Sequence, residues 1–138
     1  MKKLTGKIMV LSGFFCMLLL FILTGCGRKG EERNQYHYKV YYVNHDRTSV
    51  ISEDYVTETT DGEELLDELT EQLGTVPEKL QYHAPLAGGF TLLSMRLRDE
   101  QLILDFNTTY REQEMITEIL NRAAIVRTLS QVKDVQYV

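Results

Sequence analysis

Cysteine and tryptophan are nearly missing from this sequence. Its 138 residues include two cysteines, Cys16 and Cys26, and no tryptophan. The chain after Cys26 therefore has no thiol, which excludes a disulfide, a cysteine-ligated metal and a cysteine nucleophile from that part. Its stability has to come from a hydrophobic core. The missing tryptophan disfavours a carbohydrate-binding surface, although the eight tyrosines can partly substitute.

Basic residues are outnumbered by acidic residues. The 15 basic and 20 acidic residues give a net charge of −5. Three basic residues and no acidic residue lie in the first 25 positions, so residues 26–138 keep 12 basic and 20 acidic residues and carry −8. Without a basic cluster to neutralise phosphates, this part has no electrostatic driving force for binding nucleic acid or an anionic membrane surface.

The N-terminus has the organisation of an export signal. Three lysines among the first seven residues precede an almost wholly apolar run, residues 8–22, and small residues then lead to Cys26. The tetrad L-T-G-C at residues 23–26 resembles the lipobox of bacterial lipoproteins. The resemblance implies a signal peptide at 1–25 that is cut off and a diacylglyceryl group on Cys26. This lipid would hold the protein at the extracytoplasmic face of the cell membrane.

The alternative for the same segment is an uncleaved transmembrane anchor. The apolar run ends at Leu23 and is interrupted by Ser12 and Gly13. It falls short of the ~20 apolar residues that span a bilayer comfortably. We therefore favour the lipoprotein.

Residues 26–35 are expected to form a flexible tether. From Gly27 to Gln35 there is no apolar residue, so this stretch cannot bury anything. Nine such residues span roughly 15–20 Å, which keeps the following domain close to the lipid headgroups. Residues 36–138 then have the length of one domain.

Alternating apolar and polar residues in this domain predict several strands. Two of them flank the short turn at 98–100 and are expected to pair as a hairpin. The strands are predicted at residues 36–44, 49–57, 91–97 and 101–106, with a last one starting at 134.

Apolar residues at helical spacing predict a first helix from Asp61 to Leu73, opened by a capping-box-like pattern and ended by Gly74. Its apolar residues are expected to face the core, and its acidic side is expected to be solvated. The apolar set is Leu65, Leu66, Leu69 and Leu73. The acidic set is Glu63, Glu64, Asp67, Glu68 and Glu71.

A second and longer helix is predicted from Thr109 to about Val132, again behind a possible capping box. Together with the strands it predicts an α+β fold, a single domain with a mixed sheet and both helices packed on one face. The residues of this helix expected to face inward are Met115, Ile116, Ile119, Leu120, Ala123, Ala124, Val126 and Leu129.

No pattern in the sequence supports catalysis or a bound metal. The three histidines, His37, His45 and His83, stand without further ligands at a metal-binding spacing. No G-x-S-x-G turn exposes a serine. Asp105 at a strand end could serve an envelope hydrolase, but hydrolysis of sugars needs a second carboxylate at a defined separation. We expect no enzyme activity, no cofactor and no metal.

Four segments of the domain carry a resemblance. They are K-V-Y-Y-V-N at 39–44, E-E-L-L-D-E-L at 63–69, the pair L-L-S-M-R-L and L-I-L-D-F-N between 92 and 107, and A-I-V-R-T-L-S-Q-V-K-D-V at 124–135. With these segments the chain resembles the GerMN domain, also called the sporulation and spore germination domain. The resemblance implies a fold similar to the ring-building modules of secretion assemblies. The chain shows one copy of this domain where the best-known members have two. It stops at Val138, before the turn that usually follows the last strand.

What the resemblance implies is a lipid-anchored, non-enzymatic assembly module of the cell envelope, linked to sporulation or spore germination. We expect its partner to be an envelope protein complex, contacted through the exposed tyrosines of the first strand and the loop 85–90, which ends the long connection at 75–90, since such connections are often functional. The alternative is a lipoprotein that binds cell wall or a small ligand. The expected contact residues are Tyr41, Pro85, Gly88, Gly89 and Phe90.

Overall fold

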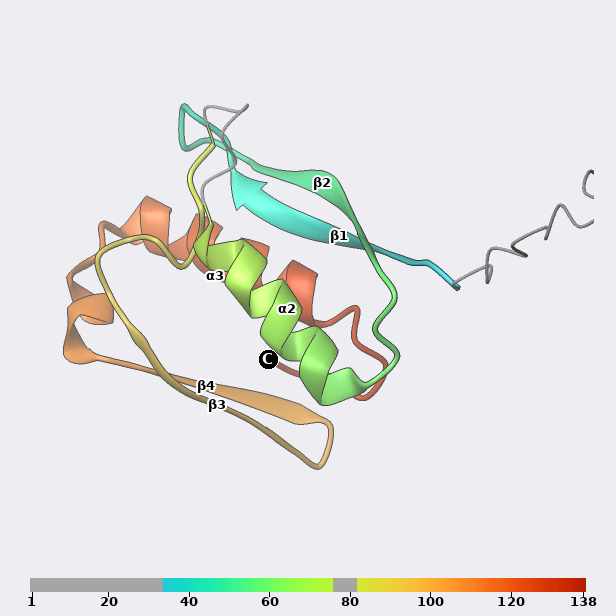
Figure 1. Ribbon diagram of the computed structural model, residues 1–138. Coiled ribbons are helices and arrows are strands. Elements are labelled where there is room, and N and C mark those ends of the chain that lie inside the picture. Colours follow the sequence, from blue (N-terminus) through green and yellow to red (C-terminus); the bar gives the residue numbers. More distant parts are fainter. Residues whose placement is uncertain (1–33, 76–81) are drawn as a thin grey trace, which may run out of the picture. The chain divides into compact units, whose positions relative to one another are not determined.

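The computed structural model describes residues 34–75 and 82–138. The predicted signal peptide, Cys26 and nearly all of the tether lie outside the described residues. Within the described ranges the elements follow the order β1, β2, α2, β3, β4, η1 and α3 (Figure 1). Strands and helices are mixed in one small domain, which confirms the α+β class.

The first two strands form a regular hairpin. β1 (Tyr36–Val43) pairs antiparallel with β2 (Val50–Thr57) along its whole length. In the turn between them, the side-chain oxygen of Asn44 accepts hydrogen bonds from the backbone N–H groups of Thr48 and Ser49, at 2.8 and 3.0 Å. This side chain replaces missing backbone partners and closes the turn. Both strands are confirmed.

The second hairpin is also as predicted. β3 (Leu92–Arg98) pairs antiparallel with β4 (Gln101–Phe106), with an irregularity between Leu92 and Ser94. The two turn residues, Asp99 and Glu100, both have positive φ angles, 48° and 66°. Such a two-residue turn matches the right-handed twist of the strands that it joins.

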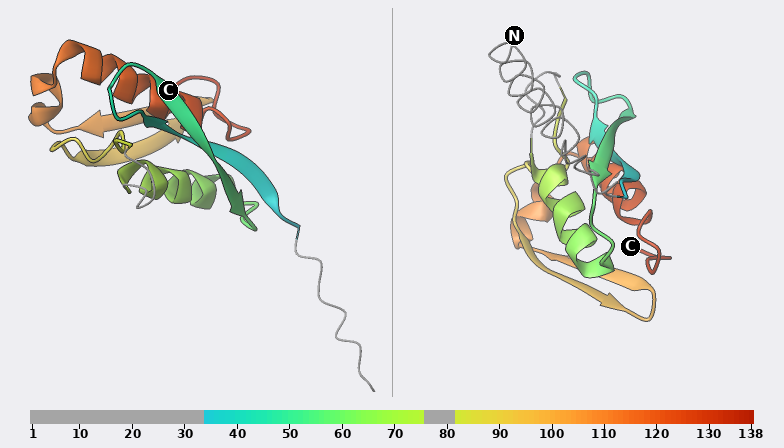
Figure 2. Two further views of the ribbon diagram at one scale, coloured as in Figure 1. Left: turned by 90° about the horizontal axis from the view of Figure 1, so that it is seen from above. Right: turned by 45° about the vertical axis from the view of Figure 1, so that its right-hand side comes forward.

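The strands do not form one mixed sheet with both helices on one face. In the described part of the chain they form two separate antiparallel pairs, β1–β2 and β3–β4, and the view from above shows α2 on one side of the strands and α3 on the other (Figures 1 and 2). The expected last strand is reduced to a single parallel bridge between Tyr137 and Gln101. There the backbone N–H of Leu102 donates to the carbonyl of Tyr137 at 2.8 Å.

Two side chains explain why β1 does not continue into a larger sheet. One comes from the last turn of the last helix and the other from the segment after it. The side-chain amide of Gln131 accepts from the N–H of Lys39 at 2.9 Å and donates to its carbonyl at 2.6 Å. The hydroxyl of Thr128 accepts from the N–H of Tyr41 at 2.9 Å. These groups occupy part of the edge where a neighbouring strand would bind. The T-L-S-Q segment thus has a structural role.

α2 (Gly62–Gly74) forms where the sequence predicts it. The side chain of Asp61 accepts hydrogen bonds from the N–H groups of Glu63 and Glu64 and so caps the helix. The four leucines expected to face the core are all buried. The helical spacing of the leucines therefore predicted both this helix and its buried face correctly.

The acidic side of α2 is not uniformly solvated, and the prediction is wrong for Glu68. Its carboxylate accepts hydrogen bonds from the hydroxyls of Tyr55 at 3.1 Å, Thr57 at 2.8 Å and Thr59. The bonds from Thr59 and then Thr57 are the main reason why the pKa of Glu68 is lowered, against the opposing effect of burial. Glu68 links α2 to the end of β2.

The long last helix begins later than predicted. α3 spans Met115–Leu129, and the residues before it form a short 3₁₀ helix, η1 (Thr108–Glu112). The ring of Tyr110 stacks on Phe106 at 4.6 Å and meets the edge of Phe90 at 5.0 Å. These contacts hold the chain in a turn where the capping-box pattern predicted a continuous helix.

The buried face of α3 also differs from the prediction at its N-terminal half. Met115, Ile116 and Ile119 are exposed, with 73%, 56% and 48% of their surface accessible. The buried stripe has regular helical spacing but includes two polar residues, which a search for apolar residues cannot recognise. The stripe consists of Asn121, Ala124, Ile125, Thr128 and Leu129.

The core lies at the junction of both hairpins and both helices. Each of them contributes buried apolar side chains, and the segment after α3 adds two valines. β3 contributes partly buried Met95, which packs against this cluster. The fully enclosed members are Leu69 and Leu73 of α2, Leu129 of α3, Val40 of β1 and Leu102 of β4.

Candidate functional site

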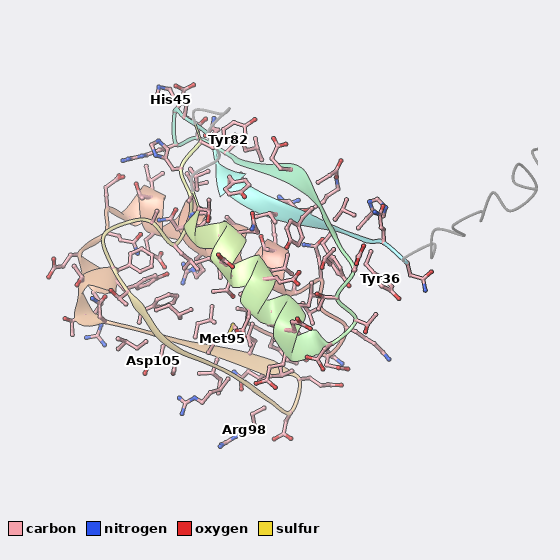
Figure 3. The ribbon with its side chains drawn as sticks, in the orientation of Figure 1. Tyr36, His45, Tyr82, Met95, Arg98 and Asp105 are labelled. Atoms are coloured by element: carbon pink, nitrogen blue, oxygen red, sulfur yellow. The ribbon has the colours of Figure 1, made fainter. Side chains whose placement is uncertain are left out.

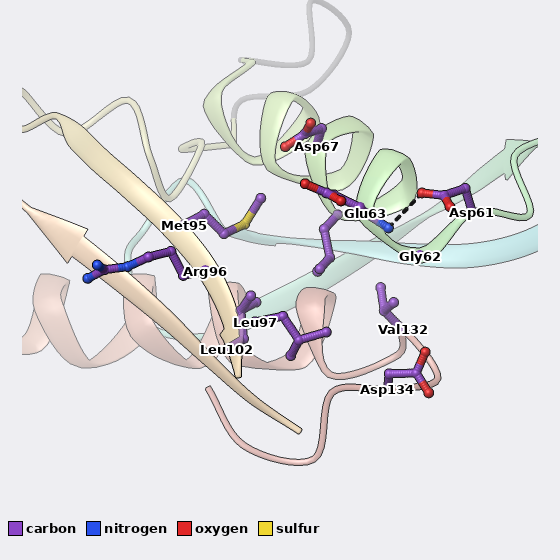
Figure 4. A pocket seen from close by; sticks show the side chains of 11 residues that line it. Asp61, Gly62, Glu63, Asp67, Met95, Arg96, Leu97, Leu102, Val132 and Asp134 are labelled. Atoms are coloured by element: carbon purple, nitrogen blue, oxygen red, sulfur yellow. Dashed lines mark hydrogen bonds between the residues drawn. The ribbon is translucent and has the colours of Figure 1, made fainter. Parts of the chain in front are cut away.

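A groove of about 590 Å³ lies between the first two turns of α2, the second half of β3 and the segment after α3 (Figure 4). We call it the acidic groove. Its carboxylates are those of Asp61, Glu63, Asp67 and Asp134. Its apolar lining consists of Leu66, Met95, Leu97, Leu102 and Val132, and Gly62 and Arg96 complete it.

Local structure explains why apolar residues line the groove. Leu66 and Leu102 are buried members of the core that also reach its surface here. Met95 points from β3 toward α2 (Figure 3), and its sulfur accepts a hydrogen bond from the hydroxyl of Thr70 at 3.4 Å. This contact joins α2 to β3 at one end of the groove. Leu97 stays 43% exposed next to it.

The charge of the groove is negative. It combines four carboxylates with the single guanidinium of Arg96. One of these carboxylates, that of Asp61, also caps α2, so its position is fixed by two backbone N–H groups. Glu63, Asp67 and Asp134 are exposed. The site therefore combines apolar side chains with an acidic rim, which suits a ligand that is both apolar and cationic.

β3 borders this groove. Met95, Arg96 and Leu97 are consecutive, and all three line it. Side chains of a strand alternate between its two faces, so Met95 and Leu97 lie on the face that they share with Leu102, and the side chain of Arg96 points away from them (Figure 4). Within the described part of the chain, β3 pairs with β4 and with no other strand.

A smaller pocket of about 240 Å³ lies beside the connection that the sequence predicted to be functional. It includes Arg47 of the first turn, Gly88 and the buried side chain of Asn121. His83 borders it and is fixed there, since its ring nitrogen contacts the carbonyl of His45 at 3.2 Å and its backbone pairs with β1. The space is small for an organic ligand.

The predicted contact residues have different environments. Pro85 and Phe90 are buried, so their side chains serve the core and can act on a partner only by positioning the loop. Gly88 and Gly89 are exposed. At Gly88 a β-carbon would lie 2.8 Å from the Phe90 ring, and Gly89 has a φ of 82°. Both positions therefore need glycine for structural reasons.

Tyr41 is half-buried on β1. The guanidinium carbon of Arg127 lies 4.3 Å from the centre of its ring, a distance at which the cation is attracted by the aromatic face. Since the backbone of Tyr41 is also bound to α3, this side chain is held in place. Part of its surface stays accessible to a partner.

Asp105 is exposed on β4, opposite Ser94. By the alternation of a strand it faces away from Leu104, which packs on the core. Within the described ranges, no three histidine, aspartate or glutamate side chains are grouped so that they could hold a metal ion. Glu63 and Asp67, which the sequence predicted to be solvated, line one groove together with Asp134, which the sequence predicted to start a last strand.

A family model described as sporulation and spore germination, named Germane, matches residues 39–138. It covers the same region as the resemblance seen in the sequence. No curated protein and no solved structure matches the chain significantly. Among the described helices, none is long and apolar enough to cross a membrane.

Proposed function

Since the chain belongs to the Germane family of sporulation and spore germination, we propose that it is a lipid-anchored, non-enzymatic interaction module on the extracytoplasmic face of the membrane. The family match carries the link to sporulation or germination. The acidic groove supports an interaction role, because it offers apolar contacts and charge to a partner.

The position of Asp105, the one catalytic candidate from the sequence, also supports binding and not catalysis. Asp105 lies exposed on the outer side of its hairpin, away from the acidic groove that would have to shelter a reacting substrate. Tyr41, Gly88 and Gly89 stay predicted partner contacts, since each keeps accessible surface. We expect Tyr41→Ala, which leaves both structurally required glycines in place, to abolish co-purification with envelope proteins while circular dichroism shows an unchanged fold.

The anchor rests on the tetrad at residues 23–26. The thiol of Cys26 would carry the lipid, and two or more acyl chains hold a protein stably at a membrane surface. Cys26→Ser removes that thiol. We therefore expect the variant to lose fatty-acid labelling completely when cells are grown with an alkynyl fatty acid.

Cys16→Ser is the matched control for this experiment. It removes the other thiol of the chain, which lies within the predicted signal peptide, and should keep the label. Equal labelling of the Cys26→Ser variant and the parent would show that the protein is not a lipoprotein of this kind.

A further inference from the structure

We propose that the acidic groove binds a short, extended and basic segment of a partner protein, which adds as a strand to the free edge of β3. The proposal rests on the function proposed above and names the chemistry of the partner. An added strand would bind through its backbone along β3, while its side chains alternate between the apolar lining and the acidic rim.

The free edge of β3 provides the backbone partners. In the described structure this strand is paired on one side only, by β4. The equivalent edge of β1 is occupied by the side chains of Thr128 and Gln131, as described above. Among residues 34–75 and 82–138, no side chain binds the backbone of β3 in this way, and its residues Met95 to Leu97 border the groove instead. Unpaired strand edges bind extended peptides through main-chain hydrogen bonds.

The apolar lining provides the anchor. Leu97 pairs across the hairpin with buried Leu102, so both lie on the same face, and yet 43% of Leu97 stays exposed. An apolar side chain of the added segment would lie against Leu97, beside the buried Leu102 and Val132, and remove the exposed surface of Leu97 from water. The volume of about 590 Å³ is in the range of ligand-binding clefts.

The rim determines the charge of the segment. Glu63, Asp67 and Asp134 give the groove a negative potential that favours lysine and arginine and disfavours acidic segments. The same charge disfavours a second copy of this chain, because residues 26–138 carry −8. The occupant is therefore a different protein with a basic, alternating segment.

Fluorescence anisotropy with a labelled peptide tests the proposal. The full chain is purified in detergent micelles, and the probe is the peptide K-V-K-L-K-V with blocked ends, at an ionic strength of about 0.15 M, where interactions of remote surface charges are screened. We expect saturable binding of this probe and none of E-V-E-L-E-V. No saturable binding of the basic probe would overturn the proposal.

Two double variants separate the groove from the general charge of the protein. Glu63→Lys with Asp67→Lys reverses two charges of the rim. Glu64→Lys with Glu71→Lys makes the same change on the same helix at exposed positions outside the groove. We expect the first to weaken binding at least about tenfold and the second less than about threefold, since charges in direct contact matter most. Equal weakening would overturn the groove as the binding site.

Two further comparisons test the anchor and the strand. Leu97→Ser should weaken binding, whereas Leu93→Ser, on the same strand and 61% exposed, should not. A probe with N-methyl groups on alternate residues keeps its charge and loses backbone donors, so it should not bind if a strand is added. Unchanged binding of the methylated probe, or of the Leu97→Ser protein, would contradict this mode.

The result is independent of the anchor. The probe experiment uses purified protein, and Cys26→Ser should bind the peptide as the parent does. Failure of the probe would therefore overturn the groove proposal and leave the lipid anchor untouched, whereas unchanged labelling of the Cys26→Ser variant would do the opposite. A dimer in sedimentation velocity that disappears in the Glu63→Lys and Asp67→Lys variant would identify a second copy as the occupant and refute the heterologous partner.

Discussion

Leu129→Ala is expected to lower the free energy of unfolding by about 2–5 kcal/mol, because it removes a fully buried side chain and leaves a cavity. Leu129 has no accessible surface and packs in the common core of both helices. A small domain has only about 5–15 kcal/mol of stability in total. Urea unfolding of a chain that begins at Asn34, followed by circular dichroism, measures the change.

The matched control is Ile119→Ala on the same helix. The sequence predicts both side chains to face inward, but 48% of Ile119 is exposed. Its replacement should change the free energy of unfolding by less than about 0.5 kcal/mol, as is usual for surface positions. A loss at Ile119 as large as the loss at Leu129 would show that the orientation of α3 is wrong.

Glu68→Ala is expected to cost about 1.5–3 kcal/mol, the range for hydrogen bonds to a charged group. Three hydroxyls, those of Tyr55, Thr57 and Thr59, donate to this carboxylate and would lose their common acceptor. Glu71→Ala, an exposed carboxylate on the same helix, should change the stability little. Equal effects of the two substitutions would show that the link between β2 and α2 does not form in solution.

The same carboxylate should make stability depend on pH. The pKa of Glu68 is lowered in the folded protein, so the folded state favours the ionised form more than the unfolded state does. Its contribution is therefore fully present above the ordinary glutamate pKa of about 4.3 and is lost as the pH falls through the lower folded value. In Glu68→Gln, the loss of stability on acidification should be smaller than in the parent. An unchanged acid profile would contradict this role.

Much of the fold was predictable because its local signals agree. The strands at both hairpins and the leucines of α2 follow simple periodicities. α3 was predicted less well, because its buried stripe contains Asn121 and Thr128. Thr128 can be buried because its hydroxyl binds the backbone of β1. A contact between segments so far apart in the sequence leaves no signal in a local pattern. Contacts of this kind also occupy part of the edge of β1, and within the described residues the strands pair as two hairpins and not as the expected mixed sheet.

The candidate site was less predictable than the fold. Glu63 and Asp67 resemble the ordinary solvated face of an amphipathic helix, and Asp134 lies far away in the sequence. Only the packing of α2 beside β3 joins them into one groove. The glycines of the loop 85–90 predicted a contact site. The structure gives them another reason, since a β-carbon at Gly88 would clash with Phe90 and Gly89 has a positive φ angle. A glycine pair can therefore mark a packing constraint as well as a binding site.

The most direct test of the interaction role is complementation of a gene deletion, measured as the yield and germination of heat-resistant spores. We predict that Asp105→Asn, which keeps shape and removes charge, restores the phenotype of the deletion strain, as does the variant with Glu64→Lys and Glu71→Lys. The variant with Glu63→Lys and Asp67→Lys should fail even though circular dichroism shows it folded, because the acidic groove no longer attracts the proposed partner. A folded Asp105→Asn protein that fails while the Glu63→Lys and Asp67→Lys variant restores spores would contradict the interaction role and indicate catalysis instead.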